Sequence, residues 1–146
     1  MHIVPAKLEH LEQLTPMFIH YRELYGAMPQ QEASKAYLSE RLKKQEAIIL
    51  LAFEQEVLIG FCLVYPSFSS VSLRPIWILN DLYVAEGERR KHVAKKLLQA
   101  ICAQAREHGA VRLRVSISTN NLIAQRLYES AGFIEDQHFR SYIALL

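Results

Sequence analysis

Residues 76–98, IWILNDLYVAEGERRKHVAKKLL, decide the fold of this chain. The mostly apolar run Ile76–Val84 predicts a buried strand, and after a short loop the spacing of apolar residues predicts a helix over about Lys91–His108. Positive charge gathers where that helix begins, although a helix amino end already carries roughly +0.5 of a charge. No Ser, Thr, Asp or Asn lies between Gly87 and Val93 to cap the helix. A bound phosphate would satisfy both features, so the stretch predicts a phosphate-bearing ligand.

The composition is ordinary for a globular chain of 146 residues, with 51% hydrophobic residues, 22% charged residues and a net charge of +2. The length predicts a single domain over residues 1–146, and the net charge is too small to indicate nucleic-acid binding by itself. Cys62 and Cys102 lie in apolar runs without metal or redox spacing, which predicts buried thiols and no metal site. The start MHIVPAKLEH is not a signal peptide and no apolar run approaches 18 residues, so we expect a cytoplasmic protein without membrane contact.

The remaining chain predicts an α/β (α+β) fold in which a mixed sheet of about seven strands carries about four helices on both faces. A doubly wound dinucleotide fold is less favoured, because no Gly-x-Gly-x-x-Gly follows the first strand. The further predicted helices are Leu8–Tyr25, Gln31–Lys44 and Asn121–Ser130, and the further strands are Met1–Val4, Ala47–Phe53, Val57–Tyr65, Val111–Ile117, Phe133–Asp136 and Phe139–Leu145. The segment Pro66–Pro75 is rich in serine and predicts a loop.

Two polar residues, Asn80 and Asp81, interrupt the apolar strand. A buried polar group without a partner costs roughly 1–3 kcal/mol, so these side chains need hydrogen bonds. Either they bond to a neighbouring loop or one of them lies in a substrate cleft, and the sequence leaves both interpretations open.

A second motif begins at Asn121 and reads NLIAQRLYESAGF. Asn121 is a suitable helix cap, and Ala124, Leu127 and Tyr128 are spaced so that they neighbour one another on one helical face. Taken alone, Tyr128 would more often be a core aromatic residue than a catalyst.

Together these motifs resemble the GCN5-related N-acetyltransferase (GNAT) superfamily. The family's phosphate motif Arg/Gln-x-x-Gly-x-Gly/Ala is similar to residues 89–94, RRKHVA, and its Asn-x-x-Ala-x-x-Leu-Tyr motif, followed by Gly-Phe, is matched in full over residues 121–133. One position departs from the pattern: His92 stands where the family has glycine, which lets the backbone approach a diphosphate without a Cβ in the way.

The resemblance implies acetyl-CoA as the acetyl donor and a primary amine as the acceptor, either a small amine, a polyamine, an amino acid or a lysine of a peptide or protein. The diphosphate would bind at the start of the helix, and the pantetheine would run along the strand like an added strand. The residues so assigned to the coenzyme are Leu82, Tyr83, Val84, Arg89, Arg90, Lys91, His92, Val93, Ala94, Lys95, Asn121 and Ala124.

The resemblance also implies the catalytic groups. Tyr128 would protonate the leaving thiolate, Asp81 is the first candidate for the base, and Asn80 would orient a water or the substrate. Glu23 or Glu32 would serve as the base instead if the N-terminal helices close over the acceptor. Those helices and the loop Phe68–Pro75 are expected to form the acceptor pocket.

Two other functions fit the sequence less well: an acyl-CoA-binding regulatory protein of the same fold without catalysis, and a basic nucleic-acid-binding module. The second uses the cluster of Arg89, Arg90, Lys91, Lys95 and Lys96. The apolar C-terminus, YIALL, would suit a homodimer because an exposed apolar strand edge invites pairing with a second chain.

Overall fold

The computed structural model describes all 146 residues, and the chain divides into two compact units, Met1–Ser116 and Ile117–Leu146. The first unit contains one sheet with helices on both faces. The second contains a single helix, α4 (Leu122–Ser130), followed by irregular chain.

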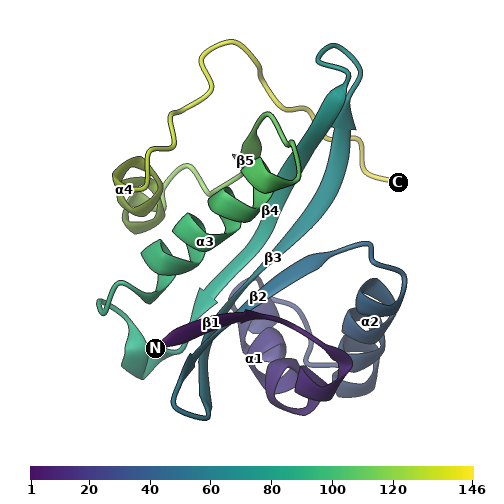
Figure 1. Ribbon diagram of the computed structural model, residues 1–146, viewed down its shortest axis with the longest axis vertical. Helices are drawn as coiled ribbons and strands as arrows, with labels where there is room; N and C mark the ends of the chain where they lie inside the picture. Colours follow the sequence, from purple (N-terminus) through teal and green to yellow (C-terminus); the bar gives the residue numbers. More distant parts are fainter. The chain divides into compact units, whose positions relative to one another are not determined.

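The sheet of the first unit has five strands in the order β1-β2-β3-β4-β5 (Figure 1). Strands β1 to β4 pair antiparallel, and β5 pairs parallel to β4, so the predicted mixed sheet is confirmed. The bounds are β1 (His2–Pro5), β2 (Ile48–Glu54), β3 (Val57–Ser69), β4 (Arg74–Val84) and β5 (Leu113–Val115).

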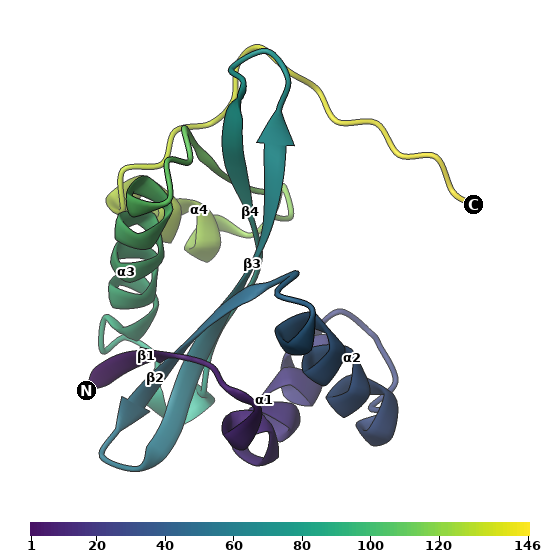
Figure 2. The ribbon, with the colours of Figure 1, turned by 45° about the vertical axis from the view of Figure 1, so that its right-hand side comes forward.

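Helices cover both faces of this sheet, as Figure 2 shows, with α1 and α2 on one side and α3 on the other. Successive side chains of a strand point to opposite faces of the sheet, so each strand can pack against helices on both faces. Leu51, Phe61 and Leu63 belong to the core shared with α1 and α2, whereas the buried face of α3 includes Leu97 and Ile101. No helix has the length and apolar content needed to span a bilayer. The helices are η1 (Leu8–His10), α1 (Leu11–Leu24), α2 (Gln31–Lys43), η2 (Glu86–Glu88) and α3 (Val93–Glu107).

Strand β4 carries a bulge at the two polar residues singled out in the sequence. Leu63 of β3 pairs with Asp81 and the next residue, Val64, pairs with Leu79, so Asn80 is an extra residue in β4. The bulge also coincides with the end of β5, which pairs with β4 only as far as Leu79. Beyond this point β4 has a strand neighbour on its β3 side alone.

The predicted loop over Pro66–Pro75 is wrong for most of its length. Strand β3 continues to Ser69 and β4 begins at Arg74, so only residues 70–73 form the turn. In this distal part of the hairpin the β3 side chains alternate between half-buried and exposed, and proline and serine are tolerated in a ladder that faces water.

The predicted number of strands is also wrong, since the sheet has five strands and not seven. Phe133–Asp136 and Phe139–Leu145 form no strand. Their apolar composition favours extended structure, but a strand exists only where a partner completes its ladder, and composition does not supply the partner. Asp136 instead accepts hydrogen bonds from the backbone amides of His138 (2.9 Å) and Phe139 (3.2 Å) and forms a turn.

A glycine of β3 sets how closely the end of β4 and the start of α3 approach. A Cβ on Gly60 would lie 2.9 Å from the main-chain oxygen of Tyr83 and 3.3 Å from Cγ1 of Val93. Gly60→Ala should therefore lower the free energy of unfolding by about 1–3 kcal/mol, measured by urea denaturation. Gly87→Ala is the matched control, since nothing lies within 4 Å of its Cβ, and it should change stability by less than about 0.5 kcal/mol. Equal effects of the two substitutions would contradict close packing at Gly60.

Candidate functional site

A cavity of about 450 Å³ lies beside the bulge of β4, between the strands and the first two helices. This is within the size range of small-molecule sites. Five aromatic rings form much of its wall, and its polar lining consists of Arg22, Ser34, Asn80 and Asp81. The aromatic residues are Phe18, Tyr21 and Tyr25 of α1 and its C-cap, Tyr37 of α2 and Tyr65 of β3.

The bulge and helix α1 are joined through a tyrosine. The hydroxyl of Tyr21 donates to the main-chain oxygen of Asn80 at 3.1 Å and also lies within hydrogen-bonding reach of the Asp81 carboxylate. The side-chain amide of Asn80 donates to the same carboxylate at 2.8 Å. The bulge thus turns Asn80 and Asp81 into the cavity, and Tyr21 satisfies the carbonyl that the extra residue exposes.

Asp81 is only 4% exposed and no cation pairs with it. Burial raises the pKa of the Asp81 carboxyl above its ordinary value, while hydrogen bonds from Tyr21 and Asn80 act in the opposite direction. Burial and the neighbouring Asp81 charge also raise the pKa of Tyr21, so its hydroxyl stays protonated. A buried carboxylate with a raised pKa is well suited to accept a proton near neutral pH.

The sequence drew attention to Asn80 and Asp81 but missed the aromatic and cationic side chains around them. Tyr21 fell on the apolar face of a predicted helix, which is equally typical of a core residue. Tyr37 and Tyr65 touch through their hydroxyl groups, although they lie on different elements. No local pattern identifies such partners, because only the packing of α2 on the sheet brings them together.

Two groups of residues expected near the acceptor do not line this cavity. No residue of the segment Phe68–Pro75 lines it, because that segment forms the distal end of the β3–β4 hairpin. The alternative bases Glu23 and Glu32 are exposed and do not line the cavity either. Asp81 is its only acidic residue.

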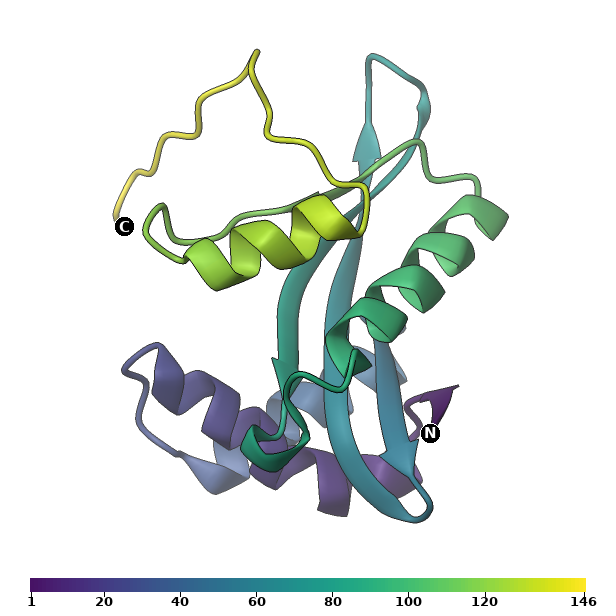
Figure 3. The ribbon, with the colours of Figure 1, turned by 90° about the vertical axis from the view of Figure 1, so that its left-hand side faces the viewer.

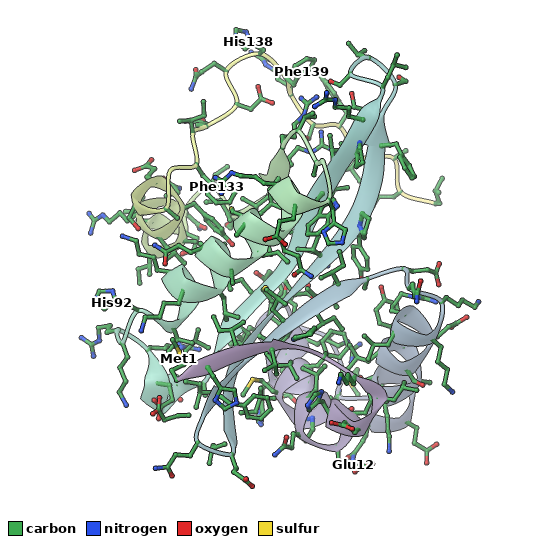
Figure 4. All side chains as sticks on the ribbon, in the orientation of Figure 1. Met1, Glu12, His92, Phe133, His138 and Phe139 are labelled. Atoms are coloured by element: carbon green, nitrogen blue, oxygen red, sulfur yellow. The ribbon has the colours of Figure 1, made fainter.

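The backbone of the basic segment before α3 adopts the left-handed conformation at two positions. The chain leaves β4, forms η2 and enters α3 (Figure 3), with positive φ of 63° at both Arg90 and His92. The left-handed conformation costs a residue with a Cβ roughly 1–2 kcal/mol. His92 is the N-cap of α3 but makes no capping bond through its side chain. This side chain is exposed at the amino end of the helix (Figure 4).

The amides at the start of α3 have no acceptor within the helix. The first helical bond of this end runs from the amide of Lys96 to the carbonyl of His92 at 3.0 Å. The amides of Val93, Ala94 and Lys95 precede it and are therefore available to an anion.

Arg89 ties this loop to the end of the strand. Its Nε donates to the main-chain oxygen of Val84 at 3.2 Å, and its guanidinium lies over the ring of Tyr83, 5.8 Å from the centroid. Lys91 pairs with Glu88 at 2.9 Å. Leu82, Tyr83 and Val84 form the end of β4. Along these residues no strand of the sheet pairs with β4 on its β5 side. The first unit thus brings the strand end, the basic loop and the uncapped helix together.

Asn121, Ala124 and Tyr128 belong to the second unit. The Asn121 side-chain oxygen accepts from the amide of Ala124 at 3.1 Å, as its predicted role as a helix cap requires. The Tyr128 ring lies edge-on to Phe133, with centroids 5.3 Å apart. With its oxygen accepting the capping bond, the side-chain nitrogen of Asn121 still has two hydrogens to donate to a ligand.

Comparison with known proteins identifies the family and the fold of this chain. Residues 11–133 match the acetyltransferase (GNAT) family. An uncharacterized N-acetyltransferase of Bacillus subtilis strain 168, YhfO, is 39% identical over 142 residues, which cover 97% of this chain and 95% of the relative. The crystal structure of a probable acetyltransferase is 52% identical with a TM-score of 0.96, covering all of this chain and 98% of that one. The fold is also shared by the aminoglycoside N-acetyltransferase AAC(6')-Iy in complex with CoA, at 23% identity and a TM-score of 0.81, over 98% and 93% of the two chains.

The chain belongs to the acetyltransferase (GNAT) family and is an acetyltransferase.

The burial of Asp81 predicts a pH-dependent effect on stability. Because its folded-state pKa lies above the unfolded value, folding is favoured most when the carboxyl is protonated, and this contribution is lost as pH rises through the folded-state pKa. Asp81→Asn removes the buried charge and should raise the melting temperature by a few degrees at pH 7–8, with a gain that shrinks toward pH 4. Asp136→Asn, at the other aspartate of the chain, should show no such gain. A pH-independent effect of Asp81→Asn would contradict this account.

Proposed function

We propose that this acetyltransferase moves the acetyl group of acetyl-CoA to a primary amine that enters the cavity beside Asp81. The observation that carries the proposal is the free edge of β4. It runs from the bulge at Asn80 and Asp81 past Leu82–Val84 toward the uncapped start of α3. A donor lying along this edge would have its phosphates at the helix and its reactive end beside the carboxylate.

The residues of the first unit fit a diphosphate followed by an extended amide-containing arm. Three helix amides without an acceptor and the charges of Arg89 and Arg90 suit the diphosphate, with residues 91–95 around it. The main chain of residues 82–84 offers ladder groups to the arm, as an added strand would use them. Bound acetyl-CoA supplies an activated acetyl thioester. An amide of Tyr83 or Val84 would donate a hydrogen bond to the thioester oxygen.

Asp81 takes the proton of the acceptor in this proposal. For an amine with a pKa of about 10.4, deprotonation at pH 7 costs about 4.6 kcal/mol, so a buried base has a large effect. The free amine nitrogen forms a bond to the acetyl carbon, the bond from that carbon to sulfur breaks, and the second proton that the nitrogen loses is released to water. Asn80 orients the carboxylate or a water that relays the proton, consistent with its 2.8 Å contact to Asp81.

Two further roles in the reaction are assigned to Tyr128 and Asn121 of the second unit from the motif that contains them. Tyr128 gives a proton to the departing thiolate, and Asn121 holds the pantetheine arm through its side-chain nitrogen, with Ala124 beside it. Support for these roles comes from the motif that both residues belong to and from the capping bond of Asn121.

A homodimer stays a prediction, as do a single domain and the absence of nucleic acid among the partners. The side chains that a dimer would use, Tyr142, Ile143, Leu145 and Leu146, are exposed. This is consistent with a surface that a second chain covers.

The phosphate site is tested by Arg89→Ala. Loss of a charge-assisted hydrogen bond to the diphosphate should weaken coenzyme A binding about tenfold or more in isothermal titration. Arg106→Ala is the control, because it removes the same charge near the other end of α3 and should leave the affinity unchanged. Equal affinities of wild type and Arg89→Ala would overturn the proposed phosphate site.

The reaction is tested by free-thiol release from acetyl-CoA over a panel of primary amines. Wild type should release thiol only when a suitable amine is present, and Tyr128→Phe should lower kcat about 100-fold with little change in coenzyme affinity. Tyr142→Phe is the matched control, since that tyrosine lies in the same unit and is exposed. An unchanged kcat of Tyr128→Phe would remove Tyr128 from the acid role, and no release with any amine would contradict the proposed function.

A further inference from the structure

Two charged side chains line the cavity beside the bulge, and neither has a counter-ion in the chain. Asp81 is bonded by Tyr21 and Asn80, both neutral. Arg22, the residue after Tyr21 in α1, lines the same cavity and forms no ion pair. The two charges do not pair with each other, since no nitrogen of Arg22 lies within 4.0 Å of the carboxylate. The cavity therefore presents one negative and one positive group that are separate.

Arg22 also fastens the segment between α1 and α2, through the two terminal nitrogens of its guanidinium. Its Nη1 donates to the main-chain oxygens of Met28 (2.7 Å) and Pro29 (2.8 Å). Nη1 also contacts the Ser34 hydroxyl at 3.1 Å, and Nη2 donates to the side-chain oxygen of Gln30 at 3.1 Å. These bonds fix the segment that joins α1 to α2. All four acceptors are neutral, so the positive charge stays uncompensated.

On the other side of the guanidinium, Nε donates no hydrogen bond in the chain, and Nη2 makes only the bond to Gln30. These two nitrogens form the free edge of Arg22, and such an edge can bind a carboxylate through two parallel hydrogen bonds. Arg41, which lies nearby over the ring of Tyr37, differs in this respect, because Glu40 and Glu46 already pair with it. Arg22 alone offers the cavity an uncompensated cation.

The two charged side chains of the cavity favour some classes of amine over others as the acceptor. Asp81 and Arg22 are the only charged residues that line the cavity, and the rest is mostly aromatic or small. A polyamine would bring several ammonium groups to one carboxylate and meet the charge of Arg22. An acceptor with one ammonium and one carboxylate would match both groups, and aromatic rings would cover the carbon chain between them.

We propose that the acceptor is a free amino acid, whose reacting ammonium lies beside Asp81 and whose carboxylate is bound by the free edge of Arg22. This inference deepens the proposed function and rests on it. It assigns a specificity-determining role to Arg22 and selects one class among the amines that the reaction admits.

The experiment compares each amino acid with the amine that lacks only its carboxylate. Suitable pairs are ornithine with putrescine, lysine with cadaverine and phenylalanine with phenethylamine, and kcat/KM is measured for each by thiol release. We expect the carboxylated member to be preferred about tenfold or more in at least one pair, and its carboxamide to react like the decarboxylated amine. Equal or better use of the decarboxylated member in every pair would overturn the inference. Absence of transfer to every amine would instead contradict the proposed function.

Variants of Arg22 separate recognition from support of the connecting segment. Arg22→Gln should lower kcat/KM about 10- to 100-fold for the preferred amino acid and less than about threefold for its decarboxylated partner. Arg22→Lys keeps the charge without the two parallel bonds and should give an intermediate preference. Equal losses for both members of a pair would show that Arg22 only supports the fold. The wild-type comparison decides the inference even if neither variant folds.

Discussion

The hydrogen bond from the Tyr21 hydroxyl to the main-chain oxygen of Asn80 links the parts of the first unit on which the site depends. An extra residue in a strand leaves a carbonyl outside the regular ladder, and that carbonyl needs a hydrogen-bond donor from elsewhere. Tyr21 supplies that partner from α1. The bond therefore does more than hold a helix to a sheet: it makes the bulge tolerable, and the bulge turns Asp81 into the cavity.

The bulge also divides β4 into two parts with different tasks. Up to Leu79 the strand lies between β3 and β5 and belongs to the core. After Leu79 it has a strand on one side only, and its free edge leads to the basic loop before α3. Gly60 keeps this end of the strand close to Val93, because a Cβ would not fit there. Within one strand, a part paired on both sides is thus followed by a part with one free edge, the edge proposed to bind the donor.

The sequence predicted the parts of the site that depend on local pattern. Asn80 and Asp81 were evident because polar residues interrupt an apolar strand, and the basic helix start because its charge opposes the helix dipole. His92 was evident as a departure from glycine, and its φ of 63° agrees with the conformation that glycine adopts most easily. The bulge, the roles of Tyr21 and Arg22, and the absence of strands after Phe133 depend on partners distant in sequence, which no local pattern specifies.

Arg22 of α1 and the segment that it fastens between α1 and α2 are far along the chain from the basic loop before α3. Within the first unit, the wall of the proposed acceptor cavity adjoins the proposed donor side at the bulge and through the ring contact of Tyr21 with Tyr83. Insertions or exchanges in the segment between α1 and α2 would change the cavity wall while leaving the residues of the basic loop as they are. Such a division of labour lets a lineage diversify its acceptors while it keeps one way of transferring the acetyl group.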